Sequence, residues 1–311
     1  MKVHHSIAEY KNETQSIITI GTFDGVHIGH REILKKLTAE ATKDHLESII
    51  LTFFPHPRMV LQKESDIKLI NTIEERIAIF SKTDLNHLII HPFTKEFASL
   101  SAEAYVKNVL VDSLNVKKII IGYDHRFGKN RTANIDNLRK FGEIYNFEVQ
   151  EISAQELDDV AVSSTKIRKA LENGDLEKAN SFLGYPFMLN GTIVKGKGIG
   201  KTINFPTANL HIEEAYKLIP KNGVYVVKSV LGNDEVFGIM SIGTNPTVGG
   251  TKRTIETYFL DIEKDLYGKK IEIELLSKIR EEETFDSLKS LQYAIKNDEA
   301  FARKFIASYA Q

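Results

Sequence analysis

The 311-residue sequence predicts an α/β domain with a parallel sheet, followed by a small antiparallel β-barrel or sandwich that ends in a helix. Its length exceeds what one compact core usually holds, so two domains are expected. Short apolar runs alternate with amphipathic stretches in the first half. After residue 184, strand-like runs are separated by Gly, Asn, Asp and Pro instead. We therefore expect one domain over residues 1–184 and a second over 185–311.

The strands of the first domain are predicted by apolar, β-branched runs, which are typical of strands buried on both faces of a parallel sheet. These runs are SIITI (16–20), SIILTF (48–53), HLIIH (87–91), KIIIG (118–122) and FEVQEI (147–152). Amphipathic stretches predict helices near 29–43, 72–83, 101–114 and 132–146. Such alternation predicts a doubly wound sheet, which binds ligands at the carboxyl ends of its strands.

The second domain follows two predicted short helices, 164–172 and 175–183, with a break at Asn173-Gly174. Gly184-Tyr185-Pro186 then interrupts the chain. The strands expected after it are 191–194, 223–230, 236–242, 254–260 and 270–276. Their spacing is typical of a small antiparallel barrel or sandwich. A helix is expected from about residue 285 onward.

Composition limits the classes of function. The formal net charge is −1, so the chain lacks the basic excess of a protein that binds nucleic-acid phosphates. With no cysteine, it has no disulfide, thiolate zinc site or cysteine nucleophile. No signal peptide and no apolar run of roughly 20 residues is visible. We expect a cytoplasmic protein without a nucleic-acid, membrane or obligate protein partner.

The stretch GTFDGVHIGH (21–30) connects the first predicted strand to the first predicted helix. A helix N-terminus with its free N–H groups suits phosphate. His27 and His30 are three residues apart, so one helical turn places them on one face. Protonated or hydrogen-bonding imidazoles there could contact triphosphate oxygens. The alternatives are a histidine-rich turn and a two-histidine metal corner, for which no third ligand is obvious nearby.

A second glycine-rich stretch, GKGIGKTINFPTANL (196–210), could lie against phosphates. It is not a Walker A motif, because no G-K-[S/T] closes a G-x-x-x-x-G frame, and it is not a Rossmann fingerprint, because no β-α-β unit surrounds it. Later, TIETYFLD (254–261) reads as a strand in which Glu256 shares a face with Tyr258 and Leu260. That pattern fits an inward carboxylate and a solvent-facing one about equally.

The string G-x-F-D-G-x-H-x-G-H resembles the nucleotidyltransferase signature of the H-x-G-H class, which class I aminoacyl-tRNA synthetases share. In this form it is similar to that of bacterial bifunctional riboflavin kinase/FMN adenylyltransferases (FAD synthetases). Further segments match the family in order: TFFPHP (52–57), IGYDHRFGKNR (121–131), VSSTKIR (162–168), FPTAN (205–209), NGVY (222–225), IGTNPTVGG (242–250) and DLYGK (265–269). The chain departs from many relatives at Asn204, where they have Gly.

The resemblance implies a Rossmann-like nucleotidyltransferase domain followed by a β-barrel riboflavin kinase domain with a C-terminal helix. It implies that riboflavin and ATP give FMN in the second domain. FMN and a second ATP then give FAD and pyrophosphate in the first. Mg²⁺ is implied as cofactor.

The resemblance also assigns residues. The catalytic residues are His27, His30, Arg168 and, as the kinase base, Glu256. ATP in the adenylyltransferase site is assigned to Gly21, Phe23, Asp24, Gly25, His27, Gly29, His30, Ser163, Ser164, Thr165 and Arg168. FMN there is assigned to Phe54, Pro55, His56, Asp124, Arg126 and Phe127. ATP or flavin in the kinase site is assigned to Gly196, Gly198, Gly200, Lys201, Pro206, Thr207, Asn209, Asn222, Tyr225 and Glu256. Metal ligands are Thr207, Asn209 and Asp124.

Plainer interpretations accompany these assignments. Phe54 could be core, Ser164 and Thr165 could cap a helix, and Arg168 could then be a surface residue. The rival functions are a single-activity nucleotidyltransferase, an RNA-binding protein with an OB-like barrel, and a flavin sensor without catalysis. FPTAN argues against the first rival, and the near-neutral charge without an aromatic-basic stripe argues against the second. A complete set of catalytic positions disfavours the third.

Overall fold

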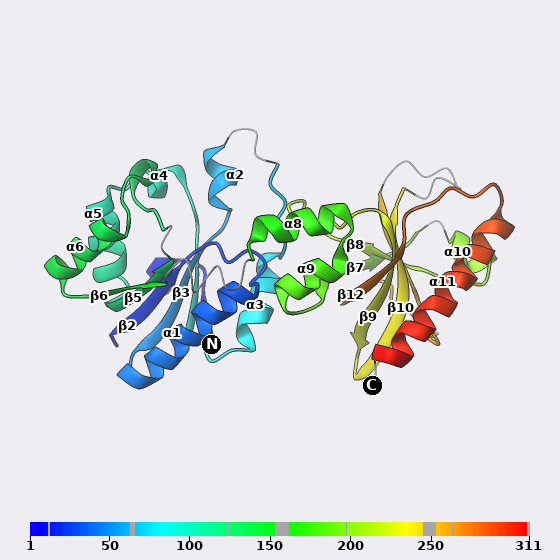
Figure 1. Cartoon of the computed structure of the whole chain (residues 1–311), viewed down its shortest axis with the longest axis horizontal. Helices are drawn as coiled ribbons and strands as arrows, with labels where there is room; N and C mark the ends of the chain where they lie inside the picture. Colours follow the sequence, from blue (N-terminus) through cyan, green and yellow to red (C-terminus); the bar gives the residue numbers. More distant parts are fainter. Residues whose placement is uncertain are drawn as a thin grey trace. The chain divides into compact units, whose positions relative to one another are not determined.

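The computed structural model describes residues 1–11, 13–62, 66–122, 125–152, 162–196, 198–244, 253–262 and 264–309. It divides into two compact units, Met1–Ser164 and Thr165–Gln311 (Figure 1). Asp124, the side chain of Lys201 and most of IGTNPTVGG lie outside the described part. None of the described helices combines the length and apolar character that a membrane crossing requires.

The first unit is built on a parallel sheet. Over the described residues it has six strands in the order β1-β4-β3-β2-β5-β6. Their bounds are β1 (Lys2–His4), β2 (Ser16–Ile20), β3 (Glu47–Phe53), β4 (His87–His91), β5 (Val116–Gly122) and β6 (Glu148–Ile152). The chain adds β3 and β4 on one side of β2, then returns to add β5 and β6 on the other. The predicted doubly wound sheet is confirmed, with its switch point between β2 and β5.

Helices cover this sheet. Their bounds are α1 (Ile28–Asp44), α2 (Pro57–Leu61), α3 (Ile73–Ser81), α4 (Lys95–Ala98), α5 (Ala102–Ala104) and α6 (Ile135–Tyr145), with short 3₁₀ turns η1 (Ile7–Glu9) and η3 (Lys129–Arg131). The predicted helix at 101–114 is α5 followed by a π-helical segment, η2 (Tyr105–Val111). Strand residues Ile18, Ile49 and Ile119 form one core with Val106 and Leu110 of η2. The β-branched runs are therefore buried between helical layers, as their composition predicts.

The second unit is a closed antiparallel barrel, which decides between the barrel and sandwich predicted. Its strand order over the described residues is β10-β11-β8-β7-β12-β9. The bounds are β7 (Phe187–Val194), β8 (Ala208–His211), β9 (Gly223–Leu231), β10 (Asp234–Gly243), β11 (Thr254–Phe259) and β12 (Lys270–Arg280). β8 links β7 to β11, so the chain directly after FPT closes the barrel wall.

Helices flank the barrel at several places (Figure 1). Their bounds are α8 (Ser164–Asn173), α9 (Leu176–Leu183), α10 (Ile199–Thr202) and α11 (Leu288–Tyr309). α9 packs on β12 and β7. The predicted C-terminal helix is confirmed as α11, whose Ala302, Phe305 and Ile306 pack against Val224 and Leu276 of the barrel. An ion pair between Asp298 of α11 and Arg280 of β12, with 2.8 Å between Oδ2 and Nη2, joins the same two elements.

Two candidate active sites

The loop between β2 and α1 has an unusual backbone. Phe23, Gly25 and Val26 have φ angles of 47°, 89° and 35°. Positive φ is uncommon for a residue with a side chain, and for β-branched valine it is a genuine outlier. Such strain persists only where the surroundings fix the chain, and it is concentrated at functional sites. The loop predicted to meet phosphate is thus held in one costly conformation.

Hydrogen bonds from outside the loop fix this conformation. The carbonyl oxygen of Thr22 accepts from Arg76 Nη1 at 2.8 Å and from Thr52 Oγ1 at 3.2 Å. The Asp24 side chain is fully buried, and its Oδ1 accepts from the backbone N–H groups of residues 70 and 71 at 2.9 and 3.3 Å. Asp24 was predicted to bind ATP. In the structure its carboxylate ties the loop to the segment that leads into α3.

His27 and His30 lie together at the start of α1, as their spacing predicts. Their rings stack, with 3.6 Å between centroids and an interplanar angle of 18°. His27 caps the helix, because its Nδ1 accepts from the His30 backbone N–H at 3.4 Å. Since Nδ1 of His27 accepts, a neutral His27 carries its proton on Nε2 and can donate from there.

Burial keeps both imidazoles neutral. It lowers the pKa of His27 to about 4. For His30, burial first and then the charges of His27 and Arg76 hold the pKa well below its ordinary value. Of the two predicted forms, protonated or hydrogen-bonding, the geometry supports the neutral hydrogen-bonding one at pH 7. The Nδ1 atom of His30 is buried and has no hydrogen-bond partner. Within the described residues, no group of three or more His, Asp or Glu side chains is placed to hold a metal ion.

The start of α8 lies against this loop. Ser164 Oγ donates to the backbone carbonyl of Asp24 at 2.8 Å. Two motifs separated by 140 positions in the chain therefore meet. In a helix cap the serine hydroxyl would accept from the N–H groups of its own helix, so this bond is a different use of Ser164. Thr165 and Arg168 follow on α8, in the second compact unit.

The residues predicted to hold FMN are spread over two segments. Phe54 is half-buried and Pro55 is exposed, and a cis peptide bond joins them. His56 begins α2, where its Nδ1 accepts from a backbone N–H at 3.1 Å. Arg126 is exposed, whereas Phe127 is buried. The ring of Phe127 packs against that of Tyr105, with centroids 5.8 Å apart, as part of the core.

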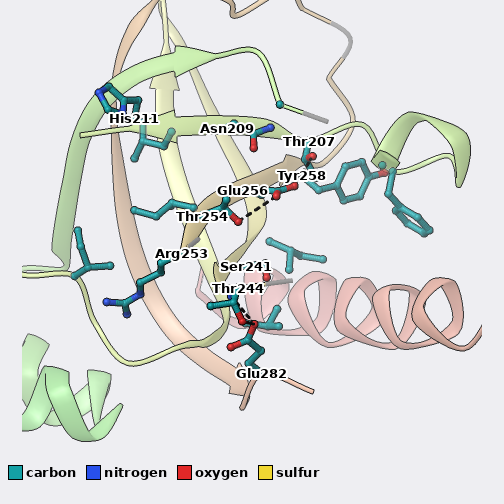
Figure 2. A pocket seen from close by; sticks show the side chains of 18 of the residues that line it. Thr207, Asn209, His211, Ser241, Thr244, Arg253, Thr254, Glu256, Tyr258 and Glu282 are labelled. Carbon is teal, nitrogen blue, oxygen red and sulfur yellow. Dashed lines mark hydrogen bonds between the residues drawn. The ribbon is translucent and has the colours of Figure 1, made fainter. Parts of the chain in front are cut away.

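The second unit contains a cavity of about 800 Å³ (Figure 2). It is lined by six of the residues predicted for the kinase site: Gly196, Gly198, Gly200, Thr207, Asn209 and Glu256. Lining residues that the sequence did not reveal include Ser241, Thr244, Arg253, Thr254, Tyr258 and Glu282. Pro206, Asn222 and Tyr225 are not among the described lining residues. Tyr225 is fully buried, and its hydroxyl donates to the Lys221 carbonyl.

Glycines at 196 and 200 allow the loop to approach the barrel wall closely. A Cβ at Gly196 would overlap the side-chain amide of Asn209. A Cβ at Gly200 would overlap the Phe205 carbonyl and lie 3.4 Å from Thr207 Oγ1. Gly198 has a positive φ of 72° with open space around it. Gly196 is thus needed for close approach to the Asn209 side chain, Gly200 for close approach to the Phe205 carbonyl, and Gly198 for its backbone conformation.

Glu256 faces the cavity, which decides between the two orientations that the strand pattern allowed. Its Oε2 accepts from Thr207 Oγ1 at 3.1 Å, and its Oε1 accepts from Thr254 Oγ1 at 3.2 Å. Asn209 is the cross-strand neighbour of Glu256 in the β8–β11 pair. Figure 2 shows the hydroxyl, amide and carboxylate of Thr207, Asn209 and Glu256 gathered in one region of the cavity wall.

Another part of the wall is organised by Glu282, which follows β12. Its Oε1 accepts from the Thr244 backbone N–H and its Oε2 from the Asn222 amide, both at 2.7 Å. Asn222, predicted to bind a ligand, thus holds a lining carboxylate in place. Arg253 lies at the start of β11 and donates to the Pro220 carbonyl. Burial lowers the pKa of Arg253, without removing its charge at neutral pH.

These features define a class of two-site transferase: a nucleotidyltransferase-type sheet with a histidine loop, joined to a barrel with a glycine-lined cavity. Family comparisons agree with both parts. The FAD synthetase family matches residues 9–166, and the riboflavin kinase family matches residues 183–306. The chain belongs to the bifunctional riboflavin kinase/FMN adenylyltransferase family, which confirms the family and the two activities predicted.

Curated relatives with that description match nearly end to end. The protein from Buchnera aphidicola subsp. Acyrthosiphon pisum is 37% identical over 98% of both chains. The one from Listeria monocytogenes is 35% identical over 98% of this chain and 97% of its own. The Escherichia coli K12 protein is 35% identical over 97% and 96%. A crystal structure described as a macrolide-efflux protein from Streptococcus pneumoniae has a TM-score of 0.85, at 28% identity over 97% of this chain and 98% of that one.

Proposed function

We propose that the two activities of this chain are divided between its two predicted domains. Residues 1–184 perform FMN adenylyl transfer, and residues 185–311 phosphorylate riboflavin. The separate family matches support this division. Packing groups α8 and α9 with the barrel, whereas Ser164 at the start of α8 bonds to the histidine loop. The proposed boundary at residue 184 therefore assigns α8, which carries part of the VSSTKIR motif, to FMN adenylyl transfer. The cysteine-free composition supports a cytoplasmic location.

The observation that supports the kinase site is the position of Glu256 beside Thr207 and Asn209 in the cavity. We assign Glu256 as the base. It takes the proton of the ribityl 5′-hydroxyl as that oxygen attacks the γ-phosphorus of ATP. The bond from the γ-phosphorus to the bridging oxygen breaks, and ADP leaves. The hydroxyls of Thr207 and Thr254 orient the carboxylate for this transfer.

The donor set at FPTAN fits Mg²⁺. The hydroxyl of Thr207 and the amide oxygen of Asn209 are hard oxygen ligands of the kind that Mg²⁺ accepts beside phosphate and water. The Gly196 position leaves the Asn209 amide directly against the loop proposed to hold the phosphates. Bound Mg²⁺ would neutralise charge on the ATP phosphates. We propose Thr207 and Asn209 as its protein ligands in the kinase site.

In the adenylyltransferase site, the FMN phosphate oxygen attacks the α-phosphorus of ATP and pyrophosphate leaves. We propose that the neutral imidazoles of His27 and His30 act there as hydrogen-bond donors to phosphate oxygens. The capping bond supports this role for His27, because it occupies Nδ1 and leaves a proton on Nε2. Arg168 is proposed to supply positive charge to the leaving group.

The test is to incubate the protein with riboflavin, ATP and Mg²⁺, and to separate FMN from FAD by chromatography. The wild type should form both. The double variant His27→Ala/His30→Ala should accumulate FMN without FAD. If this variant is folded but makes neither product, the division into two independent sites is wrong. Chelation of Mg²⁺ with EDTA should stop FMN formation, and added Mg²⁺ should restore it.

A further inference from the structure

Six of the eight residues of the segment LINTIEER (69–76) are buried, and four of these six are polar or charged. Asn71 and Glu75 are fully buried, and Thr72 and Arg76 are 2% exposed. A capping box sets the start of α3 within it: Thr72 Oγ1 accepts from the Glu75 N–H at 3.1 Å, and Glu75 Oε2 accepts from the Thr72 N–H at 2.9 Å. The position of Arg76, one residue later, is therefore fixed by the helix start.

This segment supplies donors to both sides of the strained residue Phe23. Arg76 donates to the Thr22 carbonyl, and the N–H groups of residues 70 and 71 donate to the Asp24 carboxylate. The backbone on either side of Phe23 is thus tied to one rigid piece of structure. Because Phe23 and Val26 would otherwise relax toward negative φ, these bonds determine where the following histidines stand.

A buried arginine is costly to retain for packing alone. Removing a guanidinium from water carries a large desolvation penalty, and an apolar side chain of similar volume would fill the space at less cost. The Thr22 carbonyl already has one donor, Thr52 Oγ1. What Arg76 adds is a long planar group that reaches this carbonyl from α3 and a positive charge close to His30. Both effects act on the histidine loop.

We propose that Arg76 is a positioning residue of the adenylyltransferase site. By holding the Thr22 carbonyl, it fixes the strained loop so that His27 and His30 face the ATP phosphates. This inference rests on the proposed assignment of adenylyl transfer to that loop. Arg76 acts through the loop, not by contact with substrate.

The test compares Arg76→Met, Arg76→Lys and the control Arg139→Met in the full-length protein. Arg139 is a half-exposed arginine of the same unit, paired with Asp136 and Glu151. FAD formation from FMN is measured as kcat and KM, and FMN formation from riboflavin reports on the other unit. We expect kcat for FAD formation to fall about 100-fold in Arg76→Met, with KM for FMN within about threefold, as misplaced catalytic groups cause. FMN formation and the Arg139→Met variant should stay at wild-type rates.

A pH profile separates positioning from mere destabilisation. The groups that act on the His30 charge are His27 on α1 and Arg76 on α3. Without the Arg76 charge, the acid limb of kcat/KM for FAD formation should move to higher pH. Arg76→Lys keeps the charge, so the acid limb of its pH profile should stay in place. Its kcat should lie between those of the wild type and Arg76→Met. An unchanged kcat in folded Arg76→Met overturns the proposal, as does an equal loss in Arg139→Met.

Two further variants keep the result interpretable. If Arg76→Met does not fold, Thr52→Val removes the other donor to the Thr22 carbonyl with little change of shape. It should lower kcat for FAD formation severalfold, and a wild-type kcat in Thr52→Val then overturns the proposal. The double variant His27→Ala/His30→Ala tests the assignment of adenylyl transfer to this loop, on which the proposal rests. If that double variant still forms FAD, the loop is not the adenylyltransferase site and the assignment itself fails.

Discussion

Replacing Glu256 by Gln tests the kinase site with the least structural change. Each carboxylate oxygen of Glu256 accepts one threonine hydroxyl, from Thr207 and from Thr254. Glutamine has the same shape, and its oxygen can keep one of these bonds, while its amide nitrogen cannot accept the other. The loss of about one hydrogen bond to a charged acceptor should cost about 1.5–3 kcal/mol of stability. The protein should therefore remain folded at 25 °C.

The catalytic loss should be much larger than this stability cost suggests. A positioned general base contributes about 10²–10⁴-fold, equivalent to about 3–5 kcal/mol of activation free energy. The assay follows riboflavin to FMN with ATP and Mg²⁺, and FMN to FAD in the same preparation. We expect FMN formation to fall by at least about 100-fold, while FAD formation from added FMN is unchanged.

Two results would refute this reasoning. A kcat for FMN formation within about tenfold of wild type would show that Glu256 is not the base, since that loss is below what a base contributes. An equal fall in both activities would show that the substitution acts on the whole fold. Thr254→Val serves as a matched control. It removes one hydroxyl from the carboxylate but leaves the carboxylate itself, so its kcat should fall only severalfold.

The remaining predictions concern pH, the glycine loop and α11. The pKa of His27 is about 4 when folded and 6.5 when unfolded, so the unfolded chain binds more protons between these values. Urea titrations should therefore show the first unit losing about 3 kcal/mol of stability from pH 7 to pH 4. The His27→Gln variant should lose less stability over the same range. Gly196→Ala should displace the Asn209 amide and raise KM for ATP at least about tenfold, roughly 1.4 kcal/mol. Asp298→Ala leaves the largely buried Arg280 without its bidentate partner. Thermal unfolding should show a loss of about 3 kcal/mol in the free energy of unfolding. FMN formation should fall, whereas FAD formation should be kept.

The sequence predicted most of the fold because the strands of both units have strong patterns. Runs such as SIITI and HLIIH are buried on both faces and have no other good structure, and their observed bounds are the predicted ones. β1 was missed because three residues of mixed polarity are too few to show an alternating pattern. Only their pairing with β4 makes them a strand. β8 was missed because glycine, asparagine and proline precede it, and its pairing with β7 and β11 outweighs local propensity.

Site residues were predictable from the sequence where they belong to a recognisable motif. They were less predictable where their role depends on being buried in the folded structure. The spacing of His27 and His30 was sufficient to predict one shared face. Thr254 could have been found by the strand period, since it lies two residues before Glu256 and therefore on the same face. Arg76 gave no such signal. An arginine on an amphipathic helix is usually exposed, and only the folded loop shows that this one is buried against a carbonyl.

The neutral histidine pair also changes where positive charge must come from. Two stacked imidazoles 3.6 Å apart cannot both be protonated cheaply, and burial already disfavours the charged form of each. Yet the reaction joins an FMN phosphate to an ATP phosphate, so the charge of two anions must be offset in the transition state. If the histidines supply directed hydrogen bonds only, arginine or metal must supply the charge. Arg76, behind the loop, supports this division because its charge disfavours protonation of His30. It also makes the acid limb of FAD formation, and its shift in Arg76→Met, the most direct measurement of how the site is organised.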